Sequence, residues 1–209
     1  MVKLYVEGGG DTAPLKTACR EGFTTFLTKV GVAKRPRVVA CGSRRDAYES
    51  FCTAVKNGEA AVLLVDSEGP VVAAHQQGKP DTWQPWQHLK QRPGDGWDKP
   101  TGAADTDCHL MVQIMESWFL ADRATLAAFF GQGFKENQLP AVSTSIEVVP
   151  KPQIYQSLEN ATKDCKTKTP YGKDAHSFKL LALIDPAKVT SASYWAKRFV
   201  DQVKKKMGE

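Results

Sequence analysis

Hydrophobic positions in the first third of the chain follow two different periods. Short apolar runs at Lys3–Val6, Arg37–Ala40 and Ala60–Val65 predict strands, and the third run is typical of a parallel strand covered on both faces. Between them, apolar residues recur at helical spacing over 15–30 and over 47–55. This β-α-β-α-β order predicts a mostly parallel, doubly wound α/β sheet with right-handed crossovers, in which the first and third strands are neighbours.

Beyond residue 70 the hydrophobic pattern is weaker. Residues 71–106 are rich in Pro, Gly and Trp and predict a long loop, which in a compact domain is usually functional or a lid. The run His109–Met115 predicts a fourth strand, and the following segment predicts a helix that reaches Phe130 and is stopped by Gly131.

The last third of the chain is predicted to be mainly helical. The pattern predicts helices over 154–163 and over 187–206, and it leaves the apolar run 178–184 ambiguous between helix and strand. We therefore expect an α/β core over residues 1–130 and a helical C-terminal extension over 131–209 that packs on it.

Composition and charge narrow the class of protein. No apolar run approaches the roughly 18 residues that cross a bilayer, so no contact with a membrane is expected. The five cysteines are odd in number and lack zinc-ligand spacing, and Cys19 and Cys52 fall at apolar positions; free thiols and a reducing cytoplasm are therefore expected. The net charge of +5 permits an anionic partner such as nucleic acid without requiring one.

Three carboxylates follow predicted strands. Glu7 ends the first strand, and Asp66 and Glu68 follow the third, where an extended chain end would place both on one face. Because the carboxyl ends of parallel strands meet at one edge of a sheet, the three should converge. Converging carboxylates repel one another unless they are protonated or bind a metal, and Mg²⁺ prefers such oxygen ligands, with Mn²⁺ as a substitute. The alternative is that these acids only cap helices and shape loops.

A second set of residues offers contacts to a substrate. Loop tryptophans Trp83, Trp86 and Trp97, interleaved with cations, suit a single strand or a flipped base, although they equally suit a small core that anchors a lid. The cations near residues 173–179 either reach a phosphate or form a solvated surface. The candidate substrate-binding residues are Gly9, Gly10, Asp11, His88, Lys90, Lys173, His176 and Lys179.

The glycine run after the first strand supports a rival hypothesis. Residues 8–13 fit the pattern G-x-G-x-x-A of dinucleotide-binding folds, and Arg44 and Arg45 follow the second strand, where the 2′-phosphate of NADP would lie. An NADP-dependent oxidoreductase is therefore an alternative. Against it, the carboxylate of Glu7 would lie beside the pyrophosphate and repel it.

Several motifs carry a resemblance to a known family. Glu7 after the first strand and the pair Asp66 and Glu68 after the third resemble the TOPRIM pattern of topoisomerases, primases and OLD-type nucleases. Over nearly its whole length the chain resembles an uncharacterised TOPRIM-like family of bacterial proteins that are often encoded beside AAA or ABC-type ATPases. The segments that carry this resemblance are Tyr5–Asp11, Pro85–Leu89, Trp97–Pro100, Met115–Asp122 and His176–Leu181.

The resemblance implies a Rossmann-like (TOPRIM-like) fold and a division of labour at the site. Glu7 would transfer a proton, while Asp66 and Glu68 would bind Mg²⁺ or Mn²⁺ for cleavage of a phosphodiester, as in a nuclease that works with an ATPase partner in defence against phage. Glu68 departs from the usual aspartate, and Gly69 and the following proline replace a further acid. Glu116 would supply that carboxylate as a metal ligand, unless it only stabilises a helix N-terminus.

A catalytically degenerate site is the other outcome of these departures. In that case the chain would be a binding subunit that docks on an ATPase.

Overall fold

The computed structural model describes all 209 residues of the sequence. Four parallel strands form one sheet in the order β2-β1-β3-β4. Val6 on the central strand pairs with Ala40 on one side and Leu64 on the other, so the first and third strands are neighbours as predicted. The strands are β1 (Lys3–Val6), β2 (Arg37–Ala40), β3 (Ala61–Asp66) and β4 (Cys108–Met111). The predicted Rossmann-like α/β fold class is confirmed.

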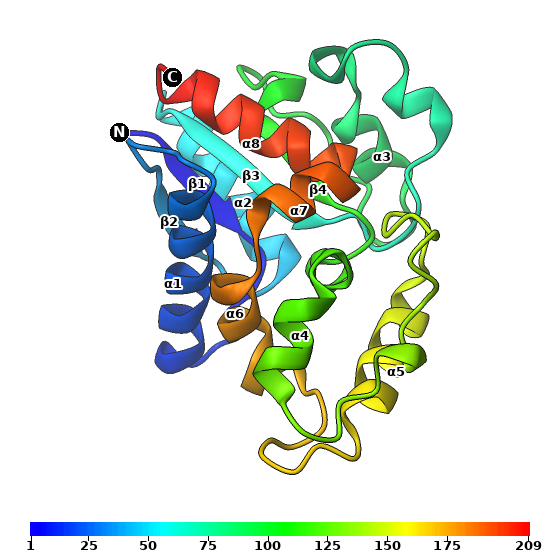
Figure 1. The fold of residues 1–209 in the computed structure, drawn as a ribbon. Coiled ribbons are helices and arrows are strands. Elements are labelled where there is room, and N and C mark those ends of the chain that lie inside the picture. The colour runs from blue at the N-terminus through cyan, green and yellow to red at the C-terminus, as the bar shows by residue number, and fades with distance from the viewer.

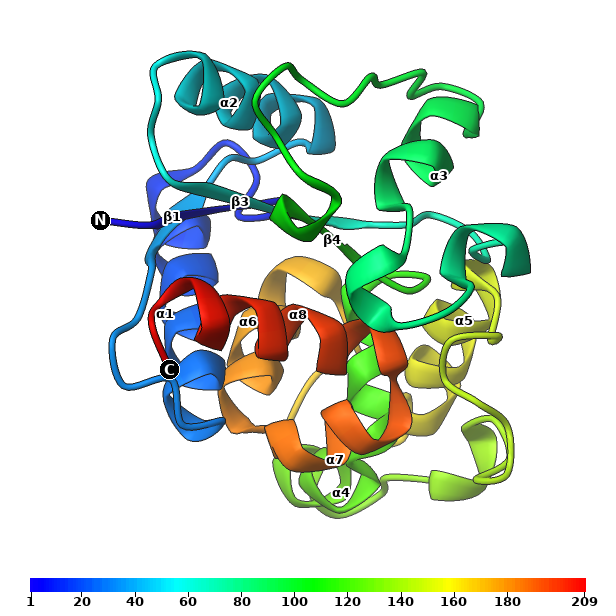
Figure 2. The same ribbon diagram turned by 90° about the horizontal axis from the view of Figure 1, so that it is seen from above.

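Helices cover both faces of this sheet (Figure 1). Helices α2 (Arg44–Lys56) and α3 (Pro85–Gln91) lie on one face, and α1 (Ala13–Lys29), α6 (Lys173–Leu183) and α8 (Tyr194–Lys206) lie on the other, as the view along the sheet edge shows (Figure 2). The remaining helices extend the second layer: α4 (Arg123–Phe130), α5 (Lys151–Thr162) and α7 (Pro186–Ala192).

Alternate strand residues supply the two hydrophobic cores. Leu4 and Leu64 belong to a cluster of 34 buried residues on the side of α1 and α6. Tyr5 and Leu63 point the other way, into a cluster of 16 residues that includes Phe51 of α2. Because successive side chains point to opposite faces and both faces are covered, the run Ala60–Val65 is apolar at every position.

Side-chain caps fix where the first two helices begin. Thr12 accepts a hydrogen bond from the Leu15 N–H at 3.4 Å, and Pro14 lies in the first turn of α1. Ser43 and Asp46 form a capping box at the start of α2. These caps follow β1 and β2 closely, and they place the N-terminus of α2 beside the carboxyl end of β1.

The segment 71–106 differs from the long loop that its composition predicts. It contains α3 and the short 3-10 helices Ala73–Gln76, Pro80–Thr82 and Asp105–Asp107. The tryptophans Trp83, Trp86 and Trp97 are buried in the cluster of 16 residues, so they anchor the segment to the sheet. Of the two readings offered by the sequence, the small core is confirmed.

The fourth strand is shorter than predicted. It ends at Met111, and Glu116 lies not at a strand end but in a 3-10 helix, Met115–Ala121. Two side chains bind the backbone beyond the strand end: the Ser117 Oγ accepts the N–H of Gln113 at 3.1 Å, and the Asp66 Oδ1 accepts the N–H of Met115 at 2.8 Å. These side chains satisfy the backbone groups that a longer strand would have paired.

The C-terminal extension is helical, as predicted, with one correction. The ambiguous run is helical, since residues 178–183 lie in α6, whereas the single helix predicted over 187–206 is divided into α7 and α8 at Ser193. The Ser193 Oγ accepts the N–H of Ala196 at 3.0 Å, which starts a new helix. Buried residues of the extension, such as Leu181, belong to the same cluster of 34 residues as α1.

Two further expectations bear on the class of protein. No helix of the structure combines the length and the apolar character that crossing a membrane requires. All five cysteines are free thiols; Cys19 is buried, whereas Cys52 is only half-buried.

Candidate metal centre

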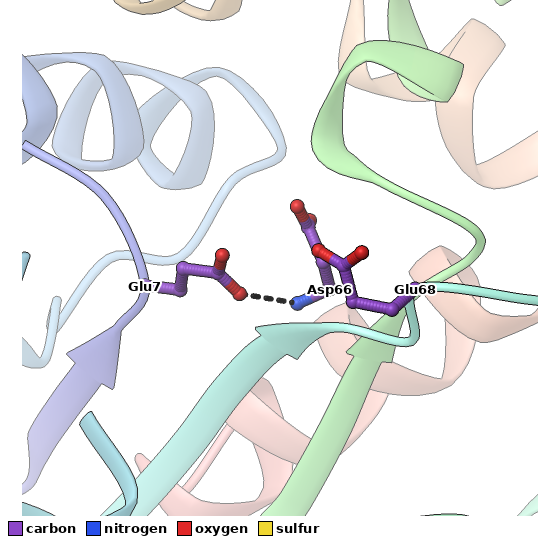
Figure 3. Close-up of side chains that lie close together, drawn as sticks. All are labelled: Glu7, Asp66 and Glu68. Atoms are coloured by element: carbon purple, nitrogen blue, oxygen red, sulfur yellow. Dashed lines mark hydrogen bonds between the residues drawn. The ribbon is translucent and has the colours of Figure 1, made fainter. Parts of the chain in front are cut away.

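The three predicted acids meet at the carboxyl edge of the sheet (Figure 3). Glu7 directly follows β1, Asp66 is the last residue of β3, and Glu68 lies two residues further on. One oxygen from each lies within 4.8 Å of the other two. Oxygens on opposite sides of a Mg²⁺ ion are about 4.2 Å apart, since each bond is about 2.1 Å long. A small closure of these flexible side chains therefore brings them within reach of one ion.

A turn, and not an extended strand end, directs Glu68 toward the cluster. The backbone of Glu68 has a φ of 62°, in the left-handed region. Its N–H donates to the carbonyl of Gln113 at 2.9 Å, and the N–H of Ser67 donates to Met111 at 3.0 Å. The expectation that Asp66 and Glu68 share one face of an extended chain was wrong, although the two carboxyl groups do lie side by side.

In both Glu7 and Asp66, one carboxylate oxygen accepts a hydrogen bond from a backbone N–H group. The Asp66 Oδ1 accepts the N–H of Met115 at 2.8 Å, and the Glu7 Oε2 accepts the N–H of Asp66 at 3.1 Å. The second oxygens, Oδ2 of Asp66 and Oε1 of Glu7, make no hydrogen bond within the protein. Each carboxyl group is thus fixed in orientation and retains an oxygen for a ligand.

Burial and mutual repulsion make this cluster electrostatically costly. Burial raises the pKa of Glu7 to about 7, against the opposing effects of Arg44 and of the Asp66 N–H. Burial, followed by the charges of Glu7 and Glu116, raises the pKa of Asp66 well above its usual value. Near neutral pH the cluster therefore favours an added proton or a cation.

Basic side chains surround the acids. The Lys151 Nζ donates to both carboxylate oxygens of Glu68, at 2.8 and 2.6 Å. The Arg44 Nε lies 3.3 Å from the Glu7 Oε2. Lys173 is solvent-accessible; partial burial disfavours its charge, but nearby Glu116 and Asp66 outweigh this effect and raise its pKa. The site thus combines a negative centre with a positive rim.

A charged bridge closes one side of the site. Asp95 accepts hydrogen bonds from both Nη atoms of Arg44, at 2.7 and 2.9 Å, and its Oδ1 forms an ion pair with the Arg92 Nη1 at 3.0 Å. The Arg44 guanidinium also lies over the Trp97 ring at 5.0 Å, while its Nε is buried without a hydrogen-bond partner. Segment 71–106 therefore contributes the charged residues Arg92 and Asp95 to the site, in addition to the tryptophans that it buries in the core.

Glu116 does not join the three acids. It is fully buried, and its Oε1 accepts from the hydroxyl groups of Tyr171 at 3.0 Å and Ser177 at 3.1 Å. The expected role as a further metal ligand has no geometric support, because this carboxylate is used by its own hydroxyl partners. Its charge still acts on Asp66 and Lys173.

Of the residues proposed to bind substrate near α3 and α6, only Lys173 interacts electrostatically with the acids of the site. The Nε2 of His88 lies 2.9 Å from the Ser67 carbonyl, so this buried ring supports the turn that carries Glu68. Lys90 is paired with Asp98. His176 is buried, and its Nδ1 accepts the N–H of Gly172 at 3.0 Å, while Lys179 is exposed on the same helix.

The glycine loop has mainly a structural role. Gly9 is buried with a φ of 87°, and a side chain there would place a Cβ atom 2.9 Å from the Cα of Lys16. Gly10 has a φ of 48°, and Asp11 is exposed at the start of the turn into α1. These residues let β1 turn sharply into α1, and no close contact ties them to the acids.

Sequence reasoning missed Lys151 and Asp95 of the rim, and it considered Arg92 only as one of the cations interleaved with the loop tryptophans. Lys151, Arg92 and Asp95 are 83, 24 and 27 residues away from Glu68 along the chain, and each lies in a segment without a recognisable motif. Arg44 was considered only as a contact to an NADP phosphate. Only the folded structure brings these charges together.

Comparisons with known proteins identify a family. A family model described as a domain of unknown function (DUF4276) matches residues 6–204. No curated protein and no solved structure matches the chain.

Proposed function

The chain belongs to the DUF4276 family, and we propose that it is a Mg²⁺-dependent enzyme that cleaves phosphodiester bonds, a nuclease. The observation that carries this proposal is the convergence of Glu7, Asp66 and Glu68 within 4.8 Å at the carboxyl edge of a parallel sheet. Ligands of such sheets bind at this edge. The likeness of these positions to the TOPRIM pattern supports the same reaction.

The donor set suits a hard divalent cation. All three side chains offer carboxylate oxygens, which Mg²⁺ and Mn²⁺ prefer. Burial is the main cause of the raised pKa values of Glu7 and Asp66, and a bound cation would offset the cost of their buried negative charge. When bound, the ion would stabilise the charge that develops on the reacting phosphate. Asp66 and Glu68 would hold it, since one carboxylate oxygen of each lies within 4.8 Å of the other.

The remaining charges have roles that fit a phosphodiester. Glu7, with a pKa of about 7, would exchange a proton through its free Oε1 at neutral pH. Arg44 and Arg92 on one side and Lys173 on the other would attract and orient the phosphate oxygens. This arrangement of a positive rim around an anionic centre supports nucleic acid as the substrate class.

Cleavage assays with single-stranded DNA and RNA test this function. We expect cleavage with Mg²⁺ or Mn²⁺ and none with a chelator. Glu7→Gln and Asp66→Asn should each lower the rate at least a hundredfold, the order expected for loss of proton transfer or of an ion ligand. Glu21→Gln, which alters an exposed acid of α1, is the matched control. Cleavage that is equal in all four proteins would refute the proposal.

A binding subunit with a degenerate site is the second candidate. It is favoured by the ion pairs that Lys151 and Arg44 make with Glu68 and Glu7, since these cations already neutralise part of the cluster. Calorimetric titration with Mg²⁺ separates the two functions. Heat of binding that disappears in Asp66→Asn contradicts the degenerate site, whereas absence of binding by the unmodified protein supports it.

The other expectations from the sequence remain predictions. An AAA or ABC-type ATPase partner and a role in phage defence rest on the resemblance alone. The NADP hypothesis is disfavoured, because Arg44 is engaged by Glu7 and Asp95, and Arg45 pairs with Glu49. A thermal shift with saturating NADP(H) would revive that hypothesis, and its absence would remove it.

A further inference from the structure

A pocket adjoins the candidate metal centre. It has a volume of about 500 Å³ and is lined in part by Ser67 and Glu68, the turn that carries one of the three acids. Sites for small molecules measure about 300–1,000 Å³, so the pocket accommodates one nucleoside but not a stretch of duplex. Glu68 belongs to both the pocket and the acid cluster. A group bound in the pocket would therefore lie directly beside a phosphate bound at the cluster.

Two buried histidines give the pocket hydrogen-bonding groups. His75 and His88 both line it and are less than one-tenth exposed. Burial lowers the pKa of His88, so its ring is neutral at pH 7. The Nδ1 of His75 is buried without a hydrogen-bond partner. An unpaired buried donor or acceptor is costly, which makes it a candidate contact for a ligand.

The rest of the lining favours a flat heterocycle. Pro70, Val72 and Pro93 present carbon surface, and Gln91 adds a side-chain amide with both donor and acceptor. A nucleobase has an apolar face and a polar edge, and this combination of carbon surface, amide and imidazole matches both. A second phosphate would require more positive charge than the lining provides.

The only permanent cation of the pocket lies at its border with the acids. Arg92 lines the pocket and forms an ion pair with Asp95 at 3.0 Å, and its Nη2 lies 3.9 Å from the Glu68 Oε2. A guanidinium in this position suits a phosphate at the metal centre whose attached sugar and base point into the pocket.

We propose that this pocket binds the nucleoside attached to the reacting phosphate, and so defines the substrate as a nucleotide unit whose base is unpaired. The inference rests on the proposed function, since it deepens the specificity of that same site. A base paired within a duplex cannot enter such a pocket without leaving its stack. Single strands, chain ends and nucleotide-like diesters are therefore the expected substrates.

Calorimetry in saturating Mg²⁺ tests the pocket without requiring turnover. The two probes are thymidine 5′-monophosphate and inorganic phosphate, which share the phosphate and differ in the nucleoside. We expect the unmodified protein to bind the nucleotide at least tenfold more tightly than phosphate. Val72→Trp should reduce this ratio to about one by filling the pocket, because Val72 is 52% exposed at its lining.

Two further variants make the result decisive. Gly69→Leu places a side chain where nothing lies within 4 Å of the new Cβ, and it should also remove the preference for the nucleotide. Val142→Trp introduces the same bulk at an 80% exposed valine that lines a different pocket, and it should keep the full ratio. Equal binding of both probes by the unmodified protein, or a ratio retained in both filled variants, would overturn the inference.

Failure of the pocket proposal and failure of the proposed nuclease function give different experimental results. Cleavage of nucleic acid without any preference for the nucleotide over phosphate would remove the pocket proposal and leave the nuclease. A nucleotide preference that is lost in Val72→Trp and Gly69→Leu, in a protein that cleaves nothing, would keep the pocket and remove the nuclease.

Discussion

At the scale of single residues, the site is a set of charges that oppose one another. The side chain of Glu7 is 14% exposed, and burial raises the pKa of its carboxyl group to about 7, far from the ordinary value of 4.5. Such a group binds a proton in the folded protein that it releases in the unfolded chain. The ion-free protein therefore gains stability from this proton at low pH and loses it as the pH rises through the folded pKa.

Glu7→Gln provides the first prediction, because the amide cannot titrate. In a chelator, the free energy of unfolding of the variant minus that of the unmodified protein should rise between pH 4.5 and about 7. The slope should approach 1.4 kcal/mol per pH unit at most, roughly the value for one proton. Urea unfolding at several pH values measures this difference.

The free energies of unfolding of the two proteins must be subtracted, because buried histidines change stability with pH in the direction opposite to Glu7. Burial lowers the pKa of His88 and of His109, so the unfolded chain takes up protons there as the pH falls. These contributions cancel between variant and unmodified protein. A difference that stays flat across this pH range would show that Glu7 has an ordinary pKa. Saturating Mg²⁺ should also reduce the slope, since the ion replaces the proton.

Lys151 provides the second prediction. Its ammonium group occupies both oxygens of Glu68, so an ion must compete with it for that carboxylate. Lys151→Gln should therefore tighten Mg²⁺ binding about tenfold, equivalent to ~1.4 kcal/mol. Calorimetric titration measures the dissociation constant directly.

The matched control removes the same charge elsewhere. Lys135 pairs with Asp164 on the surface, where both side chains are 48% exposed, and Lys135→Gln should leave the affinity for Mg²⁺ nearly unchanged. Weaker binding by Lys151→Gln, or equal changes in both variants, would show that the Lys151 ion pair does not compete with the metal.

At the scale of elements, the first half of the fold was predictable because local signals agree. The strands up to Asp66 are bounded by turn residues, and the caps at Thr12 and Ser43 lie where the periodic patterns begin. Prediction failed where side-chain hydrogen bonds decide the backbone: Ser117, which is near in the sequence, and Asp66, which is distant, end β4 early, and the apolar pattern of the strand does not indicate either bond. For the same reason the sequence predicted the three acids of the site, and Lys173 as a contact to a substrate, but not the ion pairs that Lys151 makes with Glu68 and Arg44 with Glu7.

The packing of α1 against α6 leads to the third prediction. Gly22 lies inside α1, where alanine would ordinarily stabilise a helix by roughly 0.5–1 kcal/mol. Here a Cβ atom would lie only 2.9 Å from the carbonyl oxygen of Phe178 in α6. Gly22→Ala should therefore destabilise the protein by about 1–3 kcal/mol, since the two helices must separate.

Thermal and urea unfolding give the measurement, with Glu21→Ala as the control at the adjacent exposed position of the same helix. If Gly22→Ala proves more stable than the unmodified protein, then α1 and α6 are not in close contact in solution.

At the scale of the whole molecule, the N-terminal sheet and the C-terminal extension share one core. Leu181 of α6 is fully buried in the cluster that also holds Leu4 of β1 and Phe23 of α1. Neither part buries its apolar surface alone. We therefore expect residues 1–130 and 131–209 to unfold together in a single transition.

Leu181→Ala tests this cooperativity and is the fourth prediction. It should lower the free energy of unfolding by about 2–5 kcal/mol and shift the transitions followed by circular dichroism and by tryptophan fluorescence equally. Leu183→Ala, at a position of the same helix that is 49% exposed, should cost no more than about 0.5 kcal/mol. Transitions that separate under the two probes would show that the extension unfolds independently.

The three acids lie at the ends of β1 and β3, whereas Arg92 follows α3, between β3 and β4, and Lys151 begins α5, after the last strand. A protein with these strands and different connecting segments would retain the same oxygen ligands, and it would present a different shape and a different distribution of charge to an incoming molecule. Diversity among relatives of this chain is therefore expected in the peripheral segments, with the strand ends left unaltered.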